Sequence, residues 1–74
     1  MMDENKRAFV SAIETALIMY SRIKLTSMKY NPHDEAWGGL ETVDIRFASG
    51  HRKIIDVTAD SCLGIMKDVA HALS

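Results

Sequence analysis

Along the first third of the chain, apolar residues recur at steps of three and four, which is the spacing of one helix face. This apolar stripe consists of Phe9, Ala12, Ile13, Ala16, Leu17, Tyr20 and Ile23. Val10 and Ile18 make the apolar face wider than a single narrow contact requires. Arg22 and Lys24 add positive charge near the end of the segment, where the helix dipole favours it. The pattern predicts a helix over residues 3–24.

The next segment, residues 25–30, fits two structures. One is a continuation of the helix, and the other is a short strand in which Thr26, Met28 and Tyr30 share one face. Pro32 ends any helix here, because the residue before a proline avoids the α region. Residues 31–39, which finish with two glycines, are predicted to form a loop.

The clearest pattern is the alternation of apolar and polar residues over residues 42–47, which is typical of a half-buried strand. A second alternating run covers residues 53–58, and the two runs predict a β-hairpin with its turn at residues 49–51. The expected cross-strand pairs are Val43 with Val57, Ile45 with Ile55, and Phe47 with Lys53. The outer face of the hairpin is then formed by Thr42, Asp44, Arg46, Ile54, Asp56 and Thr58.

A second amphipathic helix is predicted over residues 60–73, with Asp60 or Ser61 capping its first turn. Its apolar stripe consists of Cys62, Ile65, Met66, Val69, Ala70 and Leu73. Together the elements predict an α+β fold of order α-β-β-α: a helix, a two-stranded antiparallel hairpin and a second helix. Residues 1–74 form a single small domain, with a third short strand at residues 25–30 as the alternative.

Composition and charge narrow the class of protein. Nine Lys and Arg against ten Asp and Glu give a formal net charge of −1, which argues against non-specific binding to nucleic acid or anionic lipid. Cys62 is the only cysteine, so no disulfide forms within the chain, as is usual in a reducing cytoplasm. The longest apolar run, residues 16–20, is far too short to cross a membrane.

We expect a small soluble cytoplasmic domain. We also expect a homodimer, because two helices share one hairpin face and the first helix is wide on its apolar side.

Three groups of residues carry potential chemistry, and none of them predicts an enzyme. Cys62 begins a helix, which favours a reactive thiolate, but His71 lies about 180° around the same helix and cannot act as its base. Residues 33–35 (His-Asp-Glu) are adjacent in a loop and lack metal-ligand spacing. Asp44 and Asp56 face each other in the expected register, but the sequence implies no pocket around them. We predict no catalytic residue, no metal site and no cofactor.

Two surface features favour binding. Trp37, in a Gly-rich loop, is interpreted either as a lid over the open end of the core or as an anchor for a partner. A basic tip on the hairpin is formed by Arg46, His51, Arg52 and Lys53. With a strand at residues 25–30, the element order becomes α-β-β-β-α, which resembles that of double-stranded-RNA-binding domains. Those domains carry a lysine cluster at the start of the last helix, whereas this chain has Ala-Asp-Ser-Cys-Leu-Gly at residues 59–64.

The leading hypothesis is a non-enzymatic interaction or accessory module, of the kind that phages and mobile elements encode, which binds a protein partner. The predicted partner-binding residues are Trp37, Asp44, Arg46, Arg52, Lys53 and Asp56. The alternative is a nucleic-acid-binding module that uses the basic hairpin tip.

Overall fold

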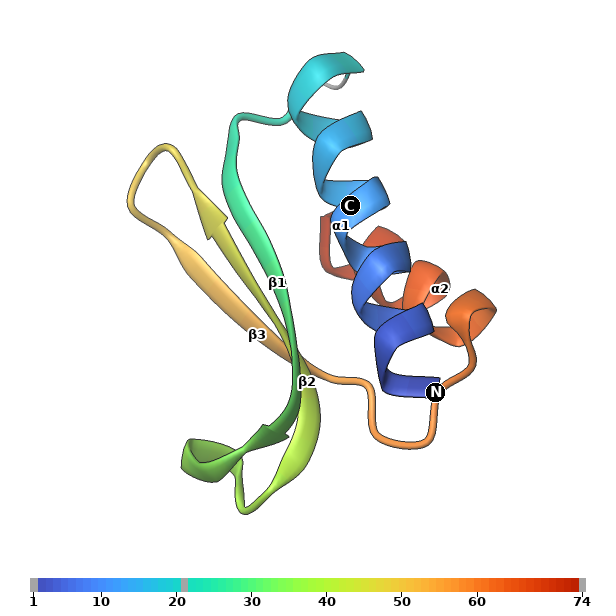
Figure 1. The fold of residues 1–74 in the computed structure, drawn as a ribbon. Helices are drawn as coiled ribbons and strands as arrows, with labels where there is room; N and C mark the ends of the chain where they lie inside the picture. Colours follow the sequence, from blue (N-terminus) through green and yellow to red (C-terminus); the bar gives the residue numbers. More distant parts are fainter. Residues whose placement is uncertain (1, 21, 74) are drawn as a thin grey trace.

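The computed structural model describes residues 2–20 and 22–73, and it has the element order α-β-β-β-α. The elements are helix α1 (Met2–Tyr20), strand β1 (Leu25–Asp34), a short 3-10 helix η1 (Glu35–Trp37), strand β2 (Leu40–Phe47), strand β3 (Arg52–Asp56) and helix α2 (Cys62–Leu73). The strands form one antiparallel sheet in the order β1-β2-β3, and both helices pack on the same face of it (Figure 1). The α+β class and the third strand are confirmed. No helix among the described residues is long and apolar enough to cross a membrane.

Strand β1 is longer than the sequence pattern indicates. The predicted helix ends at Tyr20, and the chain has joined the sheet by Lys24, whose carbonyl accepts a hydrogen bond from the Ala48 N–H. The predicted loop at residues 31–39 is wrong for its first part, because β1 continues past Pro32 to Asp34. Pro32 is tolerated since β1 is an edge strand and the pairing with β2 is irregular between Asn31 and Asp34.

The register of β2 against β3 differs by two residues from the predicted one. Val43 lies opposite Ile55, and Ile45 lies opposite Lys53. The cause is a shorter turn: the Phe47 N–H donates to the His51 carbonyl, which leaves a three-residue loop ending at Gly50, at a φ of 96°. A shift of two residues keeps each side chain on its face, so the predicted outer-face residues within β2 and β3 stay on that face, whereas Thr58 lies beyond the end of β3.

The core lies between the sheet and the two helices. Its buried side chains are Val10, Leu25, Met28, Tyr30, Val43, Ile45, Val57, Ile65 and Val69. At the start of α2, Ser61 is the capping residue, since its hydroxyl oxygen accepts a hydrogen bond from the Gly64 N–H at 3.2 Å. Gly64 lies against the Asp60 side chain: an added Cβ would lie 3.1 Å from the Asp60 carboxyl carbon, so Asp60 would have to shift by a few tenths of an ångström.

Candidate functional site

The six residues predicted to bind a partner do not form one continuous surface. Trp37 lies in η1, beside the start of β2, whereas Arg46 lies near the end of β2, with Arg52 of β3 opposite it. The eight residues of β2 span about 23 Å. Trp37 is 41% exposed, and the neighbouring Leu40 is 37% exposed. Trp37 is not among the side chains packed against the core, so its interpretation as a lid is wrong.

At the hairpin end, Asp44 is the centre of a charged cluster on the outer face of the sheet. Arg52 donates two hydrogen bonds to its carboxylate, from Nε to Oδ1 at 3.0 Å and from Nη2 to Oδ2 at 2.8 Å. The Arg46 Nη2 lies 3.6 Å from the same Oδ2. The hydrogen bonds from Arg52 hold the pKa of Asp44 below its usual value. With two guanidinium groups on one carboxylate, this Asp44 cluster (Asp44, Arg46 and Arg52) retains one positive charge.

The remaining two predicted residues have local structural roles. Lys53 lies opposite Ile45 and extends toward α2, where its ammonium donates to the Ala72 carbonyl at 2.6 Å. Asp56 accepts a hydrogen bond from the Thr58 N–H at 2.9 Å, and its hydrogen bonds with Thr58 lower its pKa. Asp56 lies opposite Thr42 and not opposite Asp44, so the predicted facing carboxylates are absent from this sheet.

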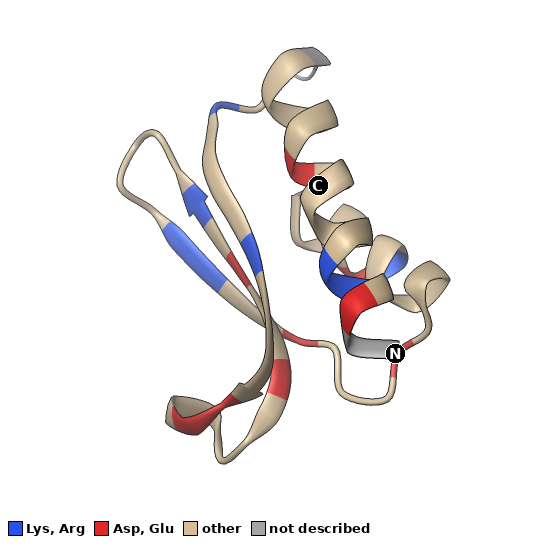
Figure 2. Cartoon of the chain, in the orientation of Figure 1, with Lys and Arg blue, Asp and Glu red and all other residues tan. Residues whose placement is uncertain are grey.

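Charge is distributed unevenly along the sheet. On β2 and β3, Lys and Arg positions lie toward the β2–β3 turn, whereas Asp and Glu positions lie in η1 and at the start of β2 (Figure 2). At the basic end a shallow depression of about 300 Å³ is lined by Thr26, Arg46, Phe47, Gly50, His51 and Arg52.

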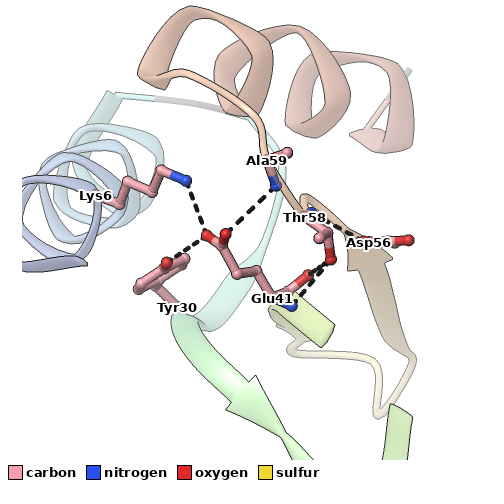
Figure 3. A network of polar contacts seen from close by, with 6 residues as sticks. All are labelled: Lys6, Tyr30, Glu41, Asp56, Thr58 and Ala59. Carbon is pink, nitrogen blue, oxygen red and sulfur yellow. Dashed lines mark hydrogen bonds and ion pairs between the residues drawn. The ribbon is translucent and has the colours of Figure 1, made fainter. Parts of the chain in front are cut away.

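A second polar network, around Glu41, is nearly buried and joins four parts of the fold (Figure 3). Glu41 Oε2 accepts hydrogen bonds from the Lys6 ammonium at 2.9 Å and from the Tyr30 hydroxyl, and Oε1 accepts one from the Ala59 N–H at 3.3 Å. The Tyr30 and Lys6 hydrogen bonds lower the pKa of Glu41. Because these contacts tie α1, β1, β2 and the segment before α2 together, we interpret this network as structural.

Cys62 lies at the start of α2, and Asp60, just before the helix, is close to Asp68 within it. The Cys62 thiol is half-buried and lines a depression of about 200 Å³ together with Asn5, Lys6 and Ser61. A hydrogen bond shared with Asp68 raises the pKa of Asp60, because one carboxyl of the pair must carry a proton. Among the residues that the structure describes, no three His, Cys, Asp or Glu side chains are arranged to hold a metal ion.

The sequence pattern did not reveal a groove between α1 and the free edge of β1. This α1–β1 groove, of about 300 Å³, is lined by Arg7, Val10, Ser11, Glu14, Met28, Lys29 and Tyr30. The Met28 N–H donates to Glu14 Oε2 at 2.7 Å, and the Tyr30 carbonyl accepts from Arg7 Nη1 at 3.4 Å. Arg7 and Glu14 are seven residues apart, so they lie on the same side of α1. This spacing is the one feature of the sequence that could have indicated a polar margin on that side of the helix.

No protein-family model matches this chain, and comparison with curated proteins and with solved structures gives no match either. Its function is therefore inferred from the geometry of the chain itself.

Proposed function

We propose that this protein is a non-enzymatic module that acts by binding a protein partner. The observation that supports the proposal is the outer face of the sheet, which neither helix covers, since α1 and α2 both pack on the opposite face (Figure 1). That face carries the Asp44 cluster, and its two arginines are more than half exposed. Accessory proteins of phages and mobile elements are a class with this size and charge, by analogy only.

The exposed residue types on the outer face and in η1 suit a protein interface. Arginine and tryptophan are enriched among the residues that contribute most to protein binding. Asp44 holds the Arg52 guanidinium in a fixed orientation before any partner arrives, which reduces the entropy lost on binding. Trp37 and Leu40 add exposed apolar area at the other end of β2.

Photo-crosslinking in the cells that make the protein tests this proposal. A photoreactive amino acid at Ile54, on the outer face, is expected to capture a defined protein, and the yield falls at least fivefold when Arg46→Ala is added. The matched control places the same group at Lys67, an exposed position on α2. Equal capture from both positions, or capture that Arg46→Ala does not change, would count against the outer face as the interface.

Nucleic-acid binding by the basic end of the sheet is a second candidate, supported by the depression that Arg46, His51 and Arg52 line. It predicts a mobility shift with single- or double-stranded RNA or DNA that weakens steeply with salt. Arg46→Gln with Arg52→Gln is expected to reduce the salt slope by about 0.9 for each phosphate that the variant no longer neutralises. Lys67→Gln, on the far side of the molecule, is the matched control.

We also propose a homodimer in a reducing cytoplasm. Support for self-association comes from the end of α1, where Ile18 is 48% and Met19 65% exposed. Light scattering at micromolar concentration is expected to give twice the chain mass, and Ile18→Gln with Met19→Gln is expected to give the single mass. A wild-type chain that is monomeric at these concentrations would contradict the dimer.

A further inference from the structure

We infer that the α1–β1 groove receives an extended segment of a partner protein, which adds to the sheet as a fourth strand beside β1. This site is separate from the outer face considered above, and neither proposal requires the other. The mode of binding is β-augmentation, in which main-chain hydrogen bonds supply affinity and side chains in the groove supply specificity.

Strand β1 presents main-chain groups outward at this position. It pairs with β2 on one side only and is an edge of the sheet. The Met28 N–H and the Tyr30 carbonyl both bond to side chains of α1, so both groups point away from β2. An edge with an outward N–H and carbonyl two residues apart is the pattern that another strand pairs with.

Two side chains of α1 take the place of that missing strand. The Glu14 carboxylate is the acceptor for the Met28 N–H, and the Arg7 guanidinium is the donor to the Tyr30 carbonyl. Arg7 is exposed, and the Glu14 side chain is 14% exposed at the groove. Both side chains are long, so they can change rotamer without a change in the backbone. Displaced Glu14 keeps a partner, because the Lys29 ammonium lies 3.4 Å from its Oε2. Exchanging side-chain for main-chain hydrogen bonds therefore leaves neither the strand nor Glu14 unpaired.

Charge in the groove indicates what the segment carries. Within the part of the chain that the structure describes, the Arg7 guanidinium has no carboxylate partner, and its carbon lies 5.9 Å from the Tyr30 ring centre. Lys29 is exposed at the groove margin, and Val10 forms an apolar floor. The occupant is an extended segment of three or four residues with an acidic side chain that pairs with Arg7 and an apolar side chain that covers Val10.

A second copy of this chain fits the groove less well. Symmetric antiparallel pairing of two β1 edges between Met28 and Tyr30 places Lys29 directly opposite Lys29 of the partner subunit. Like charges directly opposite each other destabilise a strand pair.

The test is selection of binders from a random heptapeptide library, followed by measurement with the synthetic peptides. Selected peptides are expected to contain an acidic residue, to slow hydrogen exchange of the Met28 amide, and to lose at least tenfold in affinity when alternate peptide amides are methylated. Arg7→Gln is expected to weaken binding about tenfold.

A matched pair of variants locates the site without disturbing the fold. Ser11 is exposed and lines the groove, whereas Thr15 is exposed on α1 and does not line it. Ser11→Trp is expected to abolish peptide binding, and Thr15→Trp to leave it unchanged. The inference is overturned if no peptide is selected, if Ser11→Trp binds normally, or if the bound species is a second copy of the chain. Crosslinking from Ile54 in the Ser11→Trp variant reports on the outer face independently, so the two proposals can fail separately.

Discussion

Replacing Glu41 by glutamine is expected to remove a large part of the stability of this domain. The Lys6 side chain is 6% exposed, and its ammonium is 2.9 Å from Glu41. Removing one partner of a fully buried ion pair costs about 3–5 kcal/mol. The Glu41 side chain is 20% exposed, so water reaches the pair, and we expect a loss of about 2–3 kcal/mol. A chain of this length has a total free energy of unfolding of about 4–11 kcal/mol.

Urea denaturation and thermal unfolding, followed by circular dichroism, measure this effect. The loss corresponds to a fall in Tm of about 8–24 °C for a domain of this size. Lys6→Met is the matched control, because it removes the buried ammonium and leaves the Glu41 carboxylate in partial contact with water. Its free energy of unfolding is expected to fall by about 1 kcal/mol. The double variant is expected to show a coupling free energy of at least about 1 kcal/mol. A Glu41→Gln protein within about 0.5 kcal/mol of wild type, or strictly additive single variants, would refute the reasoning.

The same carboxylate predicts a pH dependence. Since hydrogen bonds lower the folded-state pKa of Glu41, its contribution to stability is complete above its ordinary pKa of 4.5. The contribution is lost as the pH falls through the lower folded-state value. The stability difference between wild type and Glu41→Gln should therefore narrow below pH 4.5, as denaturation curves at several pH values will show.

Three further variants test other parts of the fold. Asp68→Asn should stabilise the domain at pH 7 and bring the pKa of Asp60 down toward its ordinary value of 3.8, measured by NMR titration. The stability gained by Asp68→Asn should grow as the pH rises above 3.8 through the raised folded-state pKa of Asp60, because the wild type loses stability there. A gain in stability that persists at pH 3 would contradict this explanation. Gly39→Ala should lower the free energy of unfolding by more than the about 1–2 kcal/mol that a left-handed alanine costs, because its Cβ would lie 2.7 Å from the His33 ring. Gly38→Ala is the control, since Gly38 is also left-handed but has open space around it. Equal losses for the two variants in urea denaturation would rule out the steric clash as the cause. Ile65→Ala, at a fully buried position, should cost about 2–5 kcal/mol in urea denaturation, and a loss below about 1 kcal/mol would mean that the site collapses around the smaller side chain.

The elements of this fold could be predicted wherever apolar periodicity determines burial. The alternation around Val43 and Ile45 identified β2 and its buried face, and the stripe through Ile65 and Val69 identified α2. The β2–β3 register could not be predicted, because it depends on the single position at which Gly50 adopts a left-handed conformation. Periodicity alone does not fix that position.

The candidate sites were less predictable than the elements. The residues of the outer face could be predicted from the alternation of side chains along each strand, which a two-residue shift preserves. The pairing of Asp44 with Arg52 could not, because it depends on the true register. The α1–β1 groove depends on how α1 is placed against an edge strand. Contacts such as that between Glu14 and Met28 join residues 14 positions apart that no local pattern connects.

The uneven charge along the sheet has a consequence for encounter kinetics. A net charge of −1 gives almost no long-range attraction or repulsion, so the separation of basic and acidic ends dominates the field felt at a distance. A charged macromolecule diffusing toward this protein is rotated into alignment before the two surfaces touch. The association rate constant should then fall as added salt shortens the screening length below the length of β2, while the dissociation rate constant changes little.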